Sequence, residues 1–261
     1  MSNLLIFGLG YTAARIASAL RAQGWRVDAT GSAGNLTFGD QKAVEAALAD
    51  ASHILSSVPP ASGSDPVLDT YGRELAGKWL GYLSSTGVYG DAQGAWVDEG
   101  SPTGGGRRSA RAESDARWLD LGARSFRLPG IYGPGRSALD RVRAGKANRI
   151  DLPGQVFSRI HVDDIVSGIV AGIERNAPPG AYNLADDLPC SQNAVIEEAA
   201  RLLGIEPPPL LTLEEANLSP MAHGFYAENR RVANGKARRL LGWRPLYPTY
   251  REGLAAIMAQ A

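Results

Sequence analysis

The residues that point most clearly to chemistry lie near the start of the chain, where an apolar run at 4–7 leads into the sequence GLGYTA and then into an amphipathic pattern. Gly8 allows a sharp turn from strand to helix, and Gly10 leaves room for backbone N–H groups to approach a diphosphate at the helix N-terminus. Ala13 allows the helix to pack closely on the strand. This placement favours a dinucleotide-binding loop over an ordinary glycine-rich turn. The cofactor-binding residues predicted here are Gly8, Gly10, Tyr11, Thr12 and Ala13.

The elements that must position this loop alternate between strand and helix. Strands are predicted at 4–7, 25–30, 53–58, 79–85, 124–129, 155–164 and 181–186, with a further short strand ending at Asp40. Helices are predicted at 41–49, 65–76, 109–120, 165–173 and 191–203, and a last short helix runs from Asn234 to Gly242. We expect Asp163 or Asp164 to cap the helix that follows them. The alternation is typical of an α/β fold with a parallel sheet and crossover helices.

Composition narrows the class of partner. The 261 residues carry a formal net charge of +0, so no overall field attracts nucleic acid or a membrane surface. Cys190 is the only cysteine and the three histidines are scattered, so neither an internal disulfide nor a metal site is expected. No apolar run is long enough to span a membrane, and the N-terminal run lacks a basic start typical of a secretory signal. We therefore expect a soluble, cytoplasmic protein that acts on a small molecule.

Five further segments carry a family resemblance. They are SSTGVYG at 84–90, RLPGIYGPGR at 127–136, RIHVDDIVSGI at 159–169, YNLADD at 182–187 and LGWRP at 241–245. Together they resemble the extended short-chain dehydrogenase/reductase family, the NAD-dependent epimerase/dehydratase group, in an atypical branch with a shorter glycine loop. The resemblance implies a Rossmann-type, doubly wound parallel sheet that binds NAD or NADP. It also implies a small C-terminal substrate lobe.

The resemblance divides the chain into two parts. Residues 1–128, with about 155–175, would form the NAD(P)-binding Rossmann domain. Residues 129–154 and 176–261 would form the smaller substrate-binding lobe. Members of the family often dimerise through a helix pair beside the sheet, so a homodimer is one expectation.

The choice between NADP and NAD depends on the end of the second strand, where NAD enzymes place an acid on the ribose. Gly31 stands at that position, while Asp28 lies inside the strand and is interpreted as structural or paired with a loop. Ser32 could bind a 2′-phosphate, although the usual arginine after it is missing, and NADP is favoured. Asp40 is expected either at the adenine or as a helix N-cap. By resemblance, Ser56, Ser57, Pro129 and Ile131 also face the cofactor.

The catalytic residues implied by the family are incomplete in this chain. Ser85 matches the family's Ser/Thr position, but Arg107 and Arg111 occupy the places of its Tyr and Lys. A guanidinium keeps its proton in proteins and cannot act as a general acid or base near neutral pH. Tyr89 and Tyr132 are candidates to replace the missing hydroxyl, with packing roles as the alternative.

Arginines instead suggest an anionic substrate. Arg107 and Arg111 could hold an anion in a bidentate grip; the alternative is that Arg107 and Arg108 are solvated loop charges. By resemblance, Phe157 stands where sugar-nucleotide epimerases use an arginine for the diphosphate. Arg159, two residues on, shares its face of the strand and could point into the cleft to bind the substrate, with a salt bridge at the edge of the core as the alternative. His161 is interpreted as structural.

Two functions remain open from the sequence. One is an NAD(P)-dependent oxidoreductase or epimerase acting on a sugar-like or nucleotide-linked substrate. The other is a non-catalytic dinucleotide-binding protein with a redox-sensing or regulatory role, which would explain the missing Tyr and Lys directly.

Overall fold

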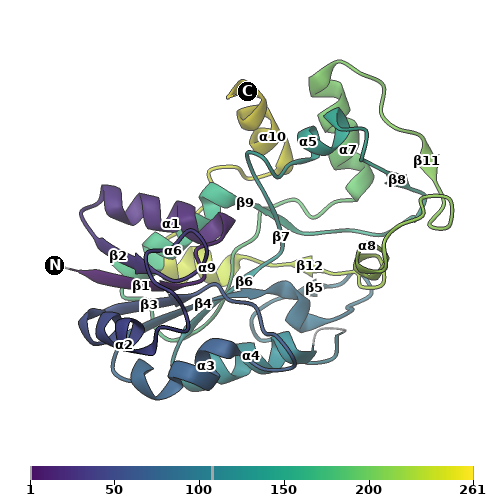
Figure 1. Cartoon of the computed structure of the whole chain (residues 1–261). Helices are drawn as coiled ribbons and strands as arrows, with labels where there is room; N and C mark the ends of the chain where they lie inside the picture. Colours follow the sequence, from purple (N-terminus) through teal and green to yellow (C-terminus); the bar gives the residue numbers. More distant parts are fainter. Residues whose placement is uncertain (1, 107–108, 261) are drawn as a thin grey trace.

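A parallel six-stranded sheet forms the centre of the molecule in the computed structural model, which describes residues 2–106 and 109–260 (Figure 1). The strand order is β10-β6-β4-β3-β1-β2. The strands are β1 (Asn3–Phe7), β2 (Arg26–Ala29), β3 (His53–Ser56), β4 (Trp79–Ser85), β6 (Arg124–Leu128) and β10 (Gly180–Asn183). Most of their residues are buried, since helices cover both faces, as parallel sheets require.

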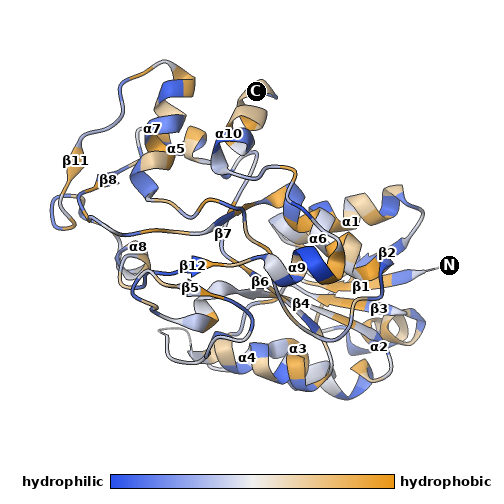
Figure 2. Ribbon diagram, turned by 180° about the vertical axis from the view of Figure 1, so that it is seen from behind, coloured by the Kyte–Doolittle hydropathy of each residue, from blue (hydrophilic) through white to orange (hydrophobic). Residues whose placement is uncertain are grey.

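The helices cover the sheet in two layers (Figure 1). One layer consists of α1 (Tyr11–Ala22), α6 (Val162–Glu174) and α9 (Gly235–Leu241). The other consists of α2 (Gln41–Asp50), α3 (Pro66–Tyr71) and α4 (Ser109–Asp120). Each layer has its own apolar core against the sheet, and β1 and β3 are among the most hydrophobic segments in Figure 2. This is the Rossmann-type, doubly wound arrangement predicted from the sequence.

A second group of helices lies beyond the carboxyl ends of the strands (Figure 1). It comprises α5 (Ala138–Arg143), α7 (Gln192–Leu203) and α10 (Tyr250–Ala259), which share a separate apolar core. The short pair β8 (Arg149–Ile150) and β11 (Leu210–Leu211) extends it. Two more short pairs, β7 (Gly130–Tyr132) with β9 (Arg159–His161) and β5 (Trp96–Val97) with β12 (Arg231–Val232), lie between this group and the sheet, near α8 (Pro220–Phe225).

The strand order fixes where a ligand site can form. β1 has β2 on one side and β3 on the other, so the chain leaves β1 and β3 toward opposite faces of the sheet. In open α/β sheets the crevice at such a switch point, outside the carboxyl ends of the strands, is the usual ligand site. Here it lies between the loop after β1 and the end of β3.

Several predicted elements differ in the structure. No strand ends at Asp40: residues 31–40 form turns, with a single bridge between Thr30 and Leu36. Helix α6 begins at Val162, and the N-cap is His161 rather than Asp163 or Asp164, because the His161 ring nitrogen accepts the Asp163 amide. Helix α7 follows the prediction, with Ser191 as its N-cap and Gly204 in the left-handed conformation after it.

The C-terminal part departs furthest from the sequence analysis. The chain does not end its regular structure at Gly242, since α10 follows with a capping box at Thr249. The predicted lobe at 176–261 also includes two pieces that belong to the sheet. β10 is its sixth strand, and Ala237 and Leu241 of α9 are buried in its core. The sequence analysis placed these two pieces in the lobe, but the chain returns to the sheet after it has crossed the lobe.

Candidate functional site

The loop after β1 is built as a close turn that Gly8 makes possible. Gly8 has φ +85°, and a Cβ there would come within 3.0 Å of the Val58 side chain. The Thr30 hydroxyl accepts the Gly8 amide at 3.1 Å, and its carbonyl accepts the Leu9 amide at 2.8 Å. Thr30 lies at the end of β2, so the neighbouring strand holds the loop in shape. Sequence analysis did not identify this threonine, because only the parallel pairing brings it to the loop.

The start of α1 has open space and uncapped backbone amides where the sequence predicts a diphosphate. A Cβ on Gly10 would meet nothing within 4 Å, so the space beside the loop is open and a side chain would fill it. Gly10 is the N-cap without a side-chain cap, and the first turn contains no acidic residue. The first amides of a helix lack intrahelical acceptors and attract anions. Ala13 is fully buried against the sheet, as expected.

A cavity of about 680 Å³ extends from this loop across the ends of the central strands. It is lined by Tyr11, Thr12, Ser57, Ser84, Ser85 and residues 128–131. The predicted residues Tyr11, Thr12, Ser57, Ser85, Pro129 and Ile131 therefore line one cavity. Ser56 does not line it: its side chain is fully buried.

Three hydroxyls mark the polar wall of the cavity at the end of β4. The Ser85 hydroxyl accepts the Gly87 amide at 3.1 Å, which fixes the oxygen in place and leaves its proton free to donate. The Ser84 hydroxyl, also at the cavity wall, is buried and has no hydrogen-bond partner in the described part of the chain. Thr86 completes the set. Unpaired buried hydroxyls are costly and are commonly satisfied by a ligand or water.

Among the described residues, no acidic side chain stands at the end of β2, where NAD enzymes bind the ribose of the cofactor. Asp28 accepts the Asn35 side-chain amide at 2.8 Å and pairs with Arg26 at 3.2 Å, which confirms its interpretation as a loop-pairing residue. Asp40 caps α2 by accepting the Ala43 amide at 3.1 Å, so the N-cap alternative is confirmed. Ser32 is exposed in the turn after β2.

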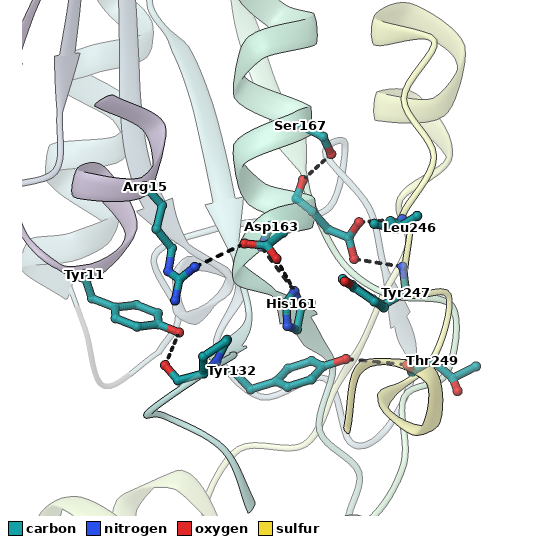
Figure 3. Close-up of polar contacts among 11 residues, drawn as sticks. Tyr11, Arg15, Tyr132, His161, Asp163, Ser167, Leu246, Tyr247 and Thr249 are labelled. Atoms are coloured by element: carbon teal, nitrogen blue, oxygen red, sulfur yellow. Dashed lines mark hydrogen bonds and ion pairs between the residues drawn. The ribbon is translucent and has the colours of Figure 1, made fainter. Parts of the chain in front are cut away.

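Both tyrosine candidates for a catalytic acid have hydrogen-bond partners outside the cavity lining. The Tyr89 hydroxyl donates to Asn183 at 2.8 Å and accepts from Arg127 at 3.0 Å. The Tyr132 hydroxyl contacts the Thr249 carbonyl at 3.5 Å, and burial raises the pKa of Tyr132 far above its usual range (Figure 3). These environments support packing roles for both tyrosines rather than proton transfer.

The positive charges that line the cavity come from arginines. Arg111 lines the cavity from α4 and donates to the Tyr82 hydroxyl at 2.8 Å; burial raises the pKa of Tyr82 to about 12. Arg159 lines it from β9 and is 6% exposed. None of the four lysines is among the lining residues in the described part of the chain. Arg107 and Arg108 lie outside the described residues.

Arg136 and Tyr226 are among the cavity residues that the sequence analysis missed. Arg136 lies with its guanidinium 5.8 Å from the Tyr11 ring centre, beside the start of α1, and makes no ion pair with any described residue. The Tyr11 hydroxyl donates to the Pro134 carbonyl at 3.1 Å, which ties the Arg136 loop to the glycine loop (Figure 3). Tyr226 lines the opposite side, near α8. Its segment looked irregular in sequence and carried no signal.

His161 takes a structural part near this cavity, as interpreted. Its Nδ1 accepts the Asp163 amide at 3.2 Å, and its ring packs against Tyr132 and Tyr247 (Figure 3). Burial lowers the pKa of His161, so the neutral ring is favoured. The side chain therefore anchors the start of α6.

Two other site classes find no support among the residues described. No group of three or more His, Cys, Asp or Glu side chains could hold a metal ion in that part of the chain. The helices described there include none with the length and apolar character needed to cross a membrane.

The sheet order and the helices on both of its faces define a Rossmann-type α/β protein with a crevice at its switch point. No protein-family model matches the chain. The chain is 31% identical over 250 residues to Protein YeeZ of Escherichia coli K12, covering 80% of this chain and 86% of that protein. It belongs to the extended short-chain dehydrogenase/reductase family, in the NAD-dependent epimerase/dehydratase group.

A second relative is a reductase. The chain is 34% identical over 169 residues to the 3-diazoavenalumate denitrifying reductase of a Streptomyces species. The match covers 59% of this chain and 54% of that enzyme, so the chain spans about half the length of this relative.

Solved structures agree with the fold. A conserved protein of unknown function from Silicibacter pomeroyi has a TM-score of 0.89 and 40% identity, with 100% of this chain and 99% of that chain covered. The human epimerase family protein SDR39U1 with NADPH has a TM-score of 0.78 and 16% identity, covering 99% and 100%. A dTDP-glucose 4,6-dehydratase from Bacillus anthracis in complex with NAD has a TM-score of 0.77 and 16% identity, covering 99% and 96%.

Proposed function

We propose that this protein binds NADP or NAD and uses it in an oxidoreductase reaction on a small, anionic organic substrate. The observation that carries the proposal is the open space at Gly10, next in sequence to Tyr11 and Thr12, which line one cavity together with Ser84 and Ser85. The cofactors named for two solved neighbours, NADPH and NAD, agree with it. NADP stays the favoured cofactor, because no acid is available at the end of β2 to bind a free ribose.

In this proposal, each residue has a role that follows from its position in the cavity. The first amides of α1 would bind the diphosphate, and Arg136 would add a cation beside it. Pro129 and Ile131 would hold the nicotinamide end, which would supply or accept a hydride when bound. The Ser85 hydroxyl, fixed by the Gly87 amide, would donate a hydrogen bond to the substrate. Arg111 and Arg159 would attract the anionic group of the substrate.

A second candidate, a dinucleotide-binding regulator without catalysis, is favoured by one observation. No tyrosine–lysine pair lines the cavity in the described part of the chain, so the family's usual acid and base are missing there. In this alternative the same cradle would bind the dinucleotide, and binding alone would change the protein's contacts.

Fluorescence titration with NADPH, followed by a turnover assay, distinguishes the oxidoreductase from the non-catalytic regulator. We expect NADPH to bind to the purified protein and Arg136→Gln to weaken binding several-fold, with exposed Arg73→Gln as the matched control. Oxidation of bound NADPH is then followed with sugar nucleotides, such as UDP-glucose, and with small organic acids. Turnover that falls in Ser85→Ala supports the oxidoreductase. Binding without turnover, unchanged in Ser85→Ala, supports the regulator. No binding of either dinucleotide contradicts both.

Domain organisation and assembly belong to the same proposal. The lobe around α5, α7 and α10 would close over the substrate, whereas β10 and α9 would stay with the sheet. A homodimer remains part of the proposal, and sedimentation velocity at several protein concentrations tests it.

A further inference from the structure

The part of the cavity nearest α8 has a composition unlike the cofactor end. We call it the lobe-side chamber and define it by Arg141, Phe157, Arg159, Gln192, Phe225 and Tyr226. Phe157 and Tyr226 meet edge to face, with ring centres 5.5 Å apart and planes at 89°. Such a pair leaves ring faces on which a planar group can pack. The Tyr226 hydroxyl makes no hydrogen bond to any described residue.

Arg159 gives the same chamber a buried positive charge. The side chain is almost fully buried, yet no carboxylate among the described residues forms an ion pair with it. Its two terminal nitrogens donate instead to neutral acceptors. These are the carbonyls of Phe157, Cys190 and Ser191, the Cys190 sulfur and the Gln192 side-chain oxygen, at 2.9–3.4 Å. The Nε–H group has no acceptor in the described part of the chain.

A buried cation without a counter-ion is costly, and an anion placed beside it removes much of that cost. Asp186 is the nearby acid, and its backbone amide donates to the Arg159 carbonyl at 2.7 Å. Burial raises the pKa of Asp186 to about 7, so this carboxyl neutralises the guanidinium only in part. The chamber therefore keeps a positive charge that a ligand can meet.

The other arginines that line the cavity are either paired with a carboxylate or more exposed than Arg159. Arg230 pairs with Glu228 at 2.9 Å and donates to the Gly90 carbonyl. Arg111 donates to Tyr82, and Arg141 is exposed. One buried, unpaired cation beside aromatic rings suits a single carboxylate attached to a ring better than a diphosphate, which carries two charges.

We infer that the substrate is an aromatic carboxylic acid, with its carboxylate at Arg159 and its ring against Phe157 and Tyr226. This inference rests on the proposed function, because the chamber opens into the same cavity as the dinucleotide loop. Arg159 selects a substrate with a negative charge, and the rings of Phe157 and Tyr226 select a substrate with a planar group.

Isothermal titration calorimetry with NADP bound tests the assignment with three probes. These are cinnamate, its uncharged amide cinnamamide, and the non-aromatic acid hexanoate; UDP-glucose is the competing ligand class. We expect cinnamate to bind at least tenfold more tightly than either matched probe. Arg159→Gln should remove the preference for cinnamate over cinnamamide. Exposed Arg143→Gln on α5, outside the cavity lining, should preserve it.

A second pair of variants covers the case in which Arg159→Gln does not fold. Phe157→Leu and Tyr226→Leu keep the charge and remove the rings, so each should reduce the preference for cinnamate over hexanoate about three- to tenfold. Equal binding of cinnamate and cinnamamide, tighter binding of UDP-glucose, or no binding of cinnamate overturns the inference. NADPH affinity is measured separately on each protein. If NADPH binds and cinnamate does not, this inference fails alone; if NADPH does not bind, the proposed function fails as well.

Discussion

Gly8 and Gly10 lie two positions apart in one loop, yet the structure gives each a different physical reason to be glycine. Gly8 has a positive φ that side chains rarely adopt, and it packs closely against Val58. Gly10 has an extended conformation that any residue adopts, with open space where a Cβ would stand. The first glycine therefore serves the fold, whereas the second is not required by the fold and has its role, under the proposed function, in binding the dinucleotide.

The same substitution at each position separates these roles. Gly8→Ala should lower the free energy of unfolding by about 1–3 kcal/mol, because it adds backbone strain and crowding. Gly10→Ala should cost less than about 1 kcal/mol in stability. It should weaken NADPH binding at least tenfold, since the added methyl group occupies the place of the diphosphate. Urea denaturation and fluorescence titration measure the two effects. An equal loss of stability in both variants would contradict this division.

At the scale of elements, the joint between α6 and the segment before α10 holds the lobe to the sheet. Asp164 is fully buried at the start of α6 and accepts the backbone amides of Leu246 and Tyr247 (Figure 3). The Trp243 side chain donates to the Asp164 carbonyl at 3.1 Å. Thus one aspartate fixes the path of the chain from α9 to α10.

Removal of this carboxylate should be far more costly than removal of its neighbour. Asp164→Ala leaves two part-buried backbone amides without their acceptor, and we expect a loss of about 2–4 kcal/mol in the free energy of unfolding. Asp163→Ala removes a half-exposed ion pair with Arg15, where the expected loss is below about 1 kcal/mol. Thermal and urea unfolding of both variants provide the measurement. A similar loss in the two would show that the Asp164 joint contributes little.

At the scale of the whole molecule, two buried acids give stability an unusual dependence on pH. Burial raises the pKa of Asp164 to about 6 and that of Asp186 to about 7. The folded state therefore keeps protons that the unfolded chain has already released near pH 4. Because the unfolded state binds fewer protons in this window, both groups lower stability as pH rises from about 4 to 7.

Asp186→Asn isolates one of these contributions. The variant keeps an oxygen for the Leu188 amide and cannot ionise. Its stability relative to the natural protein should increase by about 1 kcal/mol per pH unit between pH 4 and 7, and then stay constant. The difference is the quantity to compare, because His53 and His161, whose pKa values are lowered by burial, act in the opposite direction. Exposed Asp120→Asn on α4 is the control. A difference independent of pH would contradict the raised pKa.

Local patterns were enough for much of the fold and for one end of the site. The apolar run before Gly8, the glycine spacing and the buried Ala13 predicted the β1–α1 unit from neighbours in sequence. Ser191 and Gly204 predicted both ends of α7 for the same reason. These features depend on backbone conformation and periodicity within a few residues, which the sequence carries directly.

The rest depended on contacts between distant segments. Sequence alone determined a Rossmann-type sheet and a glycine loop. Only the tertiary structure decided that Thr30 holds the loop, that Tyr89 and Tyr132 are packed away from the cavity, and that β10 returns to the sheet. It also brought Tyr226 and Phe157 together beside a buried Arg159. Charge compensation and ring packing act across space, so no local pattern in the sequence encodes them.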